Sequence, residues 1–94
     1  MTSDNLTRLR DEIDAVDTEL AELFDRRMAL VARVAAYKAA TGEPIFDEAR
    51  ERAILERVGT ADGVAHDDSN DFAAYRADFF TTLLDLSRRY QSDN

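Results

Sequence analysis

Residues 9–38 read LRDEIDAVDTELAELFDRRMALVARVAAYK, and this stretch decides the fold. Apolar side chains recur in and around it at spacings of three and four, which places them along one face of an α-helix. No glycine or proline occurs before Gly42 and Pro44, which together end a helix cleanly, and Ser3 or Asp4 can cap its start. The sequence therefore predicts one helix from about residue 5 to about residue 40. The apolar face consists of Leu6, Leu9, Ile13, Val16, Leu20, Leu23, Leu30, Val34 and Tyr37.

The remainder of the chain predicts two further helices and no strand. Asp47 is a good N-cap residue, and we expect a helix over residues 47–58. GTADGVAHDDSN, residues 59–70, is typical of a polar loop. A third helix is expected over residues 71–91, so the predicted fold class is all-α with three helices. The expected buried face of this third helix consists of Phe72, Tyr75, Phe79, Leu83, Leu86 and Tyr90.

The first helix is too long for a compact monomer. A helix of about 36 residues spans roughly 54 Å. A compact domain of this chain length has a radius of gyration of about 12 Å and a diameter near 30 Å. Part of the apolar face would therefore project beyond the body of the chain, which is costly. We predict an obligate, intertwined homodimer in which two copies pack antiparallel along this face.

Composition limits the possible functions. The 94 residues predict a single domain over residues 1–94, without cysteine and with His66 as the only histidine, so thiolate and histidine-cluster metal sites are excluded. A net charge of −8 argues against nucleic acid as a partner. No apolar run reaches membrane-spanning length, and the first residues, MTSDNLTRLRDE, lack the apolar stretch of a signal peptide. We expect a cytoplasmic protein without a membrane partner.

Two cations of the first helix suggest an anion pocket. Arg27 fills the one gap in the apolar series, and Lys38, the only lysine against eleven arginines, follows eleven residues later. Eleven residues are close to three turns, so the two side chains point in directions about 20° apart and lie roughly 16 Å apart along the axis. Both could lean toward one anion between them. Two alternatives stay open: Arg27 as a register-setting polar residue, and Lys38 as a favourable cation at a helix C-terminus.

The other candidate residues allow a structural and a functional interpretation. Asp47 can be a simple N-cap, and Arg50 and Glu51 can be a solvated first turn. Ser87 interrupts the apolar side of the third helix, and Gln91 shares its face four residues later. A serine in this position often hydrogen-bonds to the backbone of its own helix.

Together these stretches resemble the all-helical (AroQ-type) chorismate mutase family. The family pattern is L-R-x-x-I-D-x-[ILV]-D, then R-x-x-L-x-x-x-V-x-x-x-K, then P-[IV]-x-D-x-x-R-E. Residues 6–58 follow it almost without gaps, whereas the third helix matches only in Ser87 and Gln91, and the loop over residues 59–70 is longer than is common. The matching residues are Leu9, Arg10, Ile13, Asp14, Val16, Asp17, Arg27, Leu30, Val34, Lys38, Pro44, Ile45, Asp47, Arg50 and Glu51.

The resemblance implies a dimer with two active sites that catalyse the Claisen rearrangement of chorismate to prephenate, a step toward phenylalanine and tyrosine. By analogy Arg10 of the partner subunit and Arg27 hold the two substrate carboxylates. Lys38 and Gln91 hydrogen-bond the ether oxygen of the breaking bond, and Glu51 takes the substrate hydroxyl. No cofactor or metal is implied. The residues expected to line the rest of the pocket are Asp47, Arg50 and Ser87.

Helix geometry independently supports a partner's Arg10. Arg10 and Lys38 are 28 residues apart in the sequence, which corresponds to roughly 42 Å along one helix. No small metabolite bridges that distance, whereas an antiparallel partner brings its own Arg10 close to Lys38.

Other functions on the same fold remain open at this point. Isochorismate pyruvate-lyase and 4-amino-4-deoxychorismate mutase would share the cationic residues, and Glu51 favours the 4-hydroxyl of chorismate without excluding an amine. A non-catalytic helical regulatory dimer is a further alternative. Association with another enzyme of the aromatic pathway is also possible, as some small mutases of this fold show.

Overall fold

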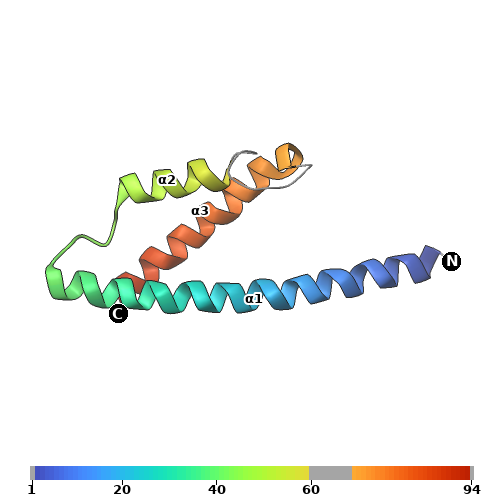
Figure 1. The fold of residues 1–94 in the computed structure, drawn as a ribbon, viewed down its shortest axis with the longest axis horizontal. Coiled ribbons are helices and arrows are strands. Elements are labelled where there is room, and N and C mark those ends of the chain that lie inside the picture. Colours follow the sequence, from blue (N-terminus) through green and yellow to red (C-terminus); the bar gives the residue numbers. More distant parts are fainter. Residues whose placement is uncertain (1, 60–68, 94) are drawn as a thin grey trace.

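The computed structural model describes residues 2–59 and 69–93, and within them the chain forms three helices and no strand (Figure 1). Helix α1 is Thr2–Thr41, α2 is Glu48–Val58 and α3 is Ser69–Asp93. The predicted all-α fold class is therefore confirmed. His66 and most of the predicted loop lie outside the described residues.

Local chemistry sets the helix ends that the sequence predicted. Gly42, with φ of 79°, follows the last residue of α1, and its N–H donates to the Lys38 carbonyl at 2.8 Å. This left-handed conformation is one that glycine adopts without a steric penalty. Asp47 caps α2, because its Oδ1 accepts a hydrogen bond from the Arg50 N–H at 3.0 Å. The expected cap of α1 at Ser3 or Asp4 is wrong, since the helix already begins at Thr2.

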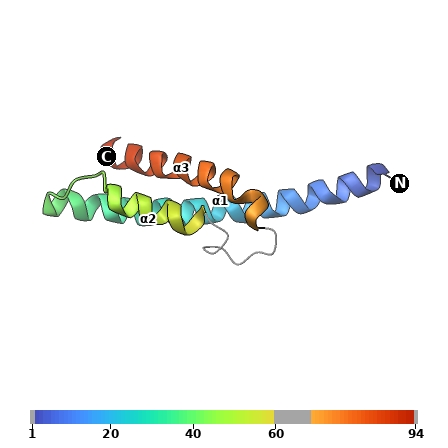
Figure 2. The same cartoon turned by 90° about the horizontal axis from the view of Figure 1, so that it is seen from above.

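Helix α3 holds the chain together by packing against both other helices, whereas α1 and α2 do not pack directly on each other within the described residues. A small core forms where α2 meets α3, from Ile54, Val58 and Leu84, with Leu55 and Phe80 packed against it. The C-terminal half of α1 contacts α3, which runs obliquely to it in Figure 1, and the N-terminal half of α1 projects alone in both views (Figures 1 and 2).

The projecting half of α1 leaves an apolar face without a partner in the single chain. The chain measures 60 × 26 × 17 Å with a radius of gyration of 16.8 Å, well above the value of about 12 Å for a compact chain of this length. The first six side chains of the predicted apolar face are 44–59% exposed. A face of this size is costly in water and is typical of an interaction surface. These side chains are Leu6, Leu9, Ile13, Val16, Leu20 and Leu23.

The N-terminal half of α3 carries three exposed aromatic side chains in the single chain. Phe72, Tyr75 and Phe79 are 52%, 74% and 48% exposed, so the helices of one chain do not bury them, and their burial stays a prediction. This part of α3 lies against the end of α2 rather than along α1, as the hydrogen bond of 2.6 Å from Arg76 Nε to the Val58 carbonyl shows. The apolar periodicity places these aromatic side chains on one face of α3. It does not indicate whether α1 packs against that face.

No helix in the described part of the chain is long and apolar enough to cross a membrane.

Candidate active site

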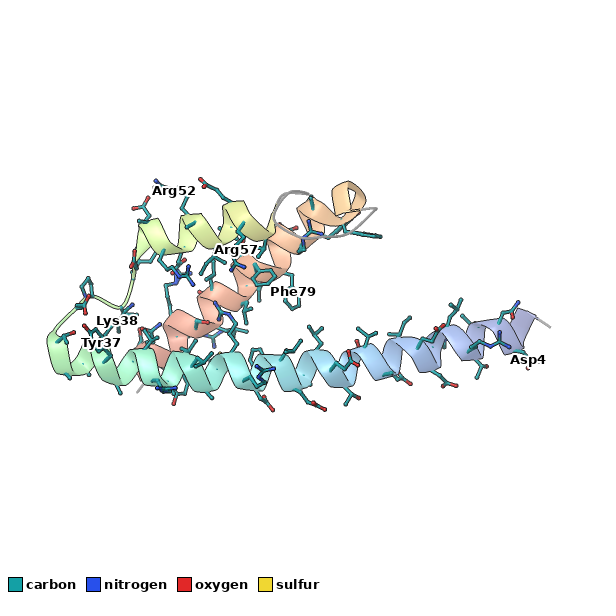
Figure 3. The ribbon with its side chains drawn as sticks, viewed as in Figure 1. Asp4, Tyr37, Lys38, Arg52, Arg57 and Phe79 are labelled. Atoms are coloured by element: carbon teal, nitrogen blue, oxygen red, sulfur yellow. The ribbon has the colours of Figure 1, made fainter. Side chains whose placement is uncertain are left out.

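All three helices and the segment that joins α1 to α2 contribute to one cavity of about 360 Å³. Seven of the eight predicted site residues line it, and Arg10 is the exception. Figure 3 shows Lys38 extending from the end of α1 toward the joining segment. The seven are Arg27, Lys38, Asp47, Arg50, Glu51, Ser87 and Gln91. The other lining residues are Leu30, Val31, Val34, Ile45, Ile54, Leu84 and Arg88.

Arg27 reaches the cavity from α1 and is held by a hydroxyl group. Its Nη1 donates to Ser87 Oγ at 2.6 Å, and Ser87 Oγ donates to the Leu83 carbonyl at 2.8 Å, the own-helix bond expected of a buried serine. Burial, followed by the nearby charge of Arg50, lowers the pKa of Arg27 from its ordinary value. Within the described residues Arg27 forms no ion pair with a carboxylate. A bound anion would therefore relieve an uncompensated positive charge.

Lys38 also lacks a carboxylate partner among the described residues. Its Nζ donates to the Ile45 carbonyl at 2.7 Å. The hydrogen bond holds the ammonium group beside the joining segment, three turns of α1 away from Arg27. The structure therefore brings the two cations to one cavity.

Helix α2 and its N-cap residue contribute two carboxylates and a cation. Asp47 lines the cavity while capping α2, and Arg50 follows in the first turn. Glu51 is mostly enclosed, with 19% of its side chain exposed, and its Oε1 lies 3.4 Å from Arg88 Nη1 on α3.

Gln91 lies one turn after Ser87 on α3. Its Nε2 donates to the Ser87 carbonyl at 3.3 Å, while its Oε1 is buried and has no hydrogen-bond partner among the described residues. An amide side chain offers both a donor and an acceptor, and rotation by half a turn exchanges them. Gln91 can thus present a donor to a ligand in the cavity.

Sequence reasoning missed Arg88. It lies beside Ser87 and is followed by Arg89, so the pair has the appearance of a solvated surface. The spacing from Leu84 to Arg88 and on to Gln91 is four and then three, which places all three on one helix face. Because Leu84 is a core residue, this spacing was the available signal.

Arg10 lies far from the cavity of its own chain. It is exposed on the projecting half of α1, 28 residues before Lys38, a separation of roughly 42 Å along the helix. No rearrangement of side chains within one chain brings it to the cavity.

The charge of the cavity is opposite to that of the whole chain. Four cations and two carboxylates line it, which gives a local net charge of +2 against −8 for the chain. A small dianion matches this local charge, because a ligand responds to the charges that surround it more than to the distant surface.

Residues 9–92 match the family described as chorismate mutase type II. The chain belongs to this family. The match spans all three helices, so the predicted resemblance to the chorismate mutase family is confirmed and extends beyond the motifs of residues 6–58.

Curated relatives match this chorismate mutase family member over only part of their own length. A bifunctional chorismate mutase/prephenate dehydratase of Enterobacter agglomerans is 49% identical over 59 residues, which cover 62% of this chain and 15% of the relative. The T-protein of the same organism is 46% identical over 50 residues, which cover 53% of this chain and 13% of the relative. A 4-amino-4-deoxychorismate mutase of Streptomyces venezuelae is 40% identical over 59 residues, which cover 62% of this chain and 57% of the relative. The matched region is thus about a seventh of the first two relatives. No solved structure matches.

Proposed function

We propose that the chain is a chorismate mutase, which rearranges chorismate to prephenate in phenylalanine and tyrosine biosynthesis. The observation that carries this proposal is the cavity with a net charge of +2, in which Arg27 and Lys38 lack carboxylate partners among the described residues. Chorismate has two carboxylates and an ether oxygen that gains negative charge as its C–O bond breaks. Family membership supports the same reaction.

Binding of the two carboxylates is the first task of the site. Arg27 takes one, with its guanidinium held by Ser87, and Arg10 of the partner subunit takes the other. Planar guanidinium groups suit carboxylates because they donate two parallel hydrogen bonds. Holding both carboxylates selects the diaxial, chair-like conformer of the substrate, which supplies part of the rate enhancement by orientation alone.

Stabilisation of the ether oxygen is the second task. Lys38 brings a compact positive charge to this oxygen, and Gln91 supplies a hydrogen bond after its amide turns. Each acts more strongly in the transition state than on bound chorismate, because the oxygen becomes more negative as the bond breaks. The rearrangement is unimolecular and pericyclic, so no side chain needs to act as nucleophile or general base.

The remaining candidate residues orient the substrate and the catalytic groups. Glu51 accepts a hydrogen bond from the 4-hydroxyl of chorismate. Asp47 fixes the start of α2, and Arg50 adds positive charge to the cavity wall. All three helices line one cavity, which supports treating residues 1–94 as a single domain. The site would thus be complete except for Arg10.

A homodimer supplies the missing Arg10 and covers the exposed face of α1. An antiparallel partner would bury the apolar side chains of the projecting half and place its N-terminal half beside the cavity. We further propose that the protein is cytoplasmic. One relative is a bifunctional chorismate mutase/prephenate dehydratase, which supports association of this chain with another aromatic-pathway enzyme.

The direct test is to follow chorismate loss and prephenate formation with the purified protein. We expect conversion whose rate varies little across neutral pH, because the amide of Gln91, the proposed hydrogen-bond donor to the ether oxygen, does not titrate. A sharp bell-shaped profile would instead indicate acid–base chemistry. A non-catalytic dimer would show no conversion and no thermal stabilisation by a dicarboxylate transition-state analogue.

The second candidate function is 4-amino-4-deoxychorismate mutase, which the relative of that name favours. Parallel assays with chorismate, isochorismate and 4-amino-4-deoxychorismate distinguish the three substrates. If kcat/KM is highest for chorismate among the three substrates, the result supports the proposal that the chain is a chorismate mutase.

Dimerisation through α1 makes a separate prediction. Ile13→Asp would bury an unpaired carboxylate in each half of a symmetric interface and should weaken the dimer by about 2–4 kcal/mol. Ala15→Asp is the matched control, because it places the same charge about 200° around the helix. Light scattering should show dissociation of the Ile13 variant, with loss of activity, and an unchanged mass for the control. Equal masses for both variants would contradict an interface along this face.

A further inference from the structure

Arg88 lines the cavity, and several contacts hold its guanidinium group in place. Its Nη1 lies 3.4 Å from Glu51 Oε1 on α2, and its Nη2 lies 3.5 Å from Asp85 Oδ1 on α3. Its Cζ also lies 5.4 Å from the centroid of the Phe46 ring, a cation–π contact. The adjacent Arg89 is 67% exposed, against 33% for Arg88. Three partners from three parts of the chain therefore orient Arg88, whereas Arg89 extends into solvent.

The contact with Arg88 changes what Glu51 offers to a ligand. Because the Glu51 side chain is only 19% exposed, water screens this ion pair less than a pair on the open surface. The guanidinium offsets much of the negative charge, but the carboxylate still has lone pairs for further hydrogen bonds. Glu51 can accept a hydrogen bond from a neutral hydroxyl and yet attract a second cation only weakly.

We propose that Arg88 is a specificity-determining residue, which acts through Glu51 to select a substrate with a neutral 4-hydroxyl group over one with a 4-ammonium group. The proposal rests on the proposed function, because it takes Glu51 as the residue that meets the substituent at C4. A hydroxyl group donates to Glu51 without opposing Arg88. An ammonium group at the same place is repelled by Arg88, and such repulsion is a common source of specificity.

The total charge of the cavity acts in the same direction. Arg88 is one of the four cations that line the cavity, and it attracts chorismate, which carries a charge of −2. Protonated 4-amino-4-deoxychorismate carries a net charge of −1, so Arg88 attracts it less strongly. Removal of Arg88 therefore weakens the attraction of chorismate more than that of the amino substrate.

Arg88→Met tests this selection. Methionine keeps an unbranched chain beside Phe46 and removes the charge. We expect the ratio of kcat/KM for 4-amino-4-deoxychorismate to kcat/KM for chorismate to rise by about tenfold or more, at a pH where the amine is protonated. If turnover of the amino substrate is too slow to follow, its inhibition constant against chorismate conversion gives the same comparison.

Two further variants separate charge from structure. Arg88→Lys keeps the positive charge and should keep a ratio near that of the wild type. Arg89→Met removes the same charge from the next residue, which shares Asp85 as a partner, and should leave the ratio unchanged. In the wild type the discrimination should also shrink as the pH rises above the pKa of the substrate amine, because the repelled charge disappears. This dependence on pH should be weaker in Arg88→Met, whereas a purely structural role of Arg88 would leave it as it is in the wild type.

The outcomes distinguish this proposal from the proposed function. If the wild type converts chorismate but the ratio is the same in Arg88→Met, or changes equally in Arg89→Met, selection by Arg88 is wrong. If the wild type converts none of the substrates, the proposed function is wrong. Circular dichroism checks folding, and Arg88→Gln replaces Arg88→Met under the same criterion if the latter does not fold.

Discussion

Replacing Lys38 with alanine should reduce kcat for chorismate conversion by about 10²–10³-fold or more, the loss seen when one oxyanion-hole donor is removed. The reason is that Lys38 places a whole positive charge, and not a neutral dipole, near the oxygen that becomes negative. The charge is held in place before the reaction by the hydrogen bond of 2.7 Å to the Ile45 carbonyl. The effect should fall mainly on kcat, because the charge on the oxygen develops after binding.

Three comparisons isolate the role of the ammonium group. Lys38→Met keeps the packing of the side chain and should be about as inactive as Lys38→Ala. Lys38→Arg keeps the positive charge but replaces a compact ammonium group with a planar guanidinium group, so it should retain only part of the wild-type rate. Arg33→Ala removes a cation from an exposed position of the same helix that does not line the cavity, and should keep full activity. Wild-type turnover by Lys38→Ala with an intact fold would remove Lys38 from the mechanism.

The sequence predicted most of the fold because the local signals are strong. An apolar face of nine residues, with no glycine or proline before Gly42, allows one long helix and hardly any other structure. Asp47 and Gly42 act at the helix ends as their chemistry predicts. Periodicity cannot give the angle between helices, and for this reason it did not indicate that Phe72, Tyr75 and Phe79 are exposed in the single chain.

The site was predictable to the extent that it depends on helix register. Arg27 and Lys38 reach one cavity because eleven residues are close to three turns. Ser87 and Gln91 face it together because four residues are close to one turn. Arg88 was missed although its spacing from Leu84 and Gln91 places it on the same face of α3. Its contacts with Glu51 and Phe46 join segments that are distant in the sequence, and helix periodicity has no information on such contacts.

Two inactive variants should restore activity to each other if the site is shared between subunits. Arg10→Ala and Lys38→Ala should each be nearly inactive as pure homodimers. In a mixed dimer, the Arg10 variant supplies Lys38 and the Lys38 variant supplies Arg10, so one of the two sites is intact. Half of the dimers are mixed after random pairing of equal amounts, so about a quarter of wild-type activity should return. Unfolding the two variants together and refolding them, or co-expressing them, provides the exchange of subunits.

The converse mixture makes the result decisive. Wild-type chains paired with the double variant Arg10→Ala, Lys38→Ala give a mixed dimer in which each site lacks either Arg10 or Lys38. Co-refolding equal amounts should therefore reduce activity to about a quarter of that of an all-wild-type sample, whereas the same proteins mixed after folding should retain about half. If Arg10 served the cavity of its own chain, the co-refolded sample would also retain half, and the two single variants would not restore each other. The geometry of α1 excludes that alternative for a straight helix, since roughly 42 Å separates the two residues.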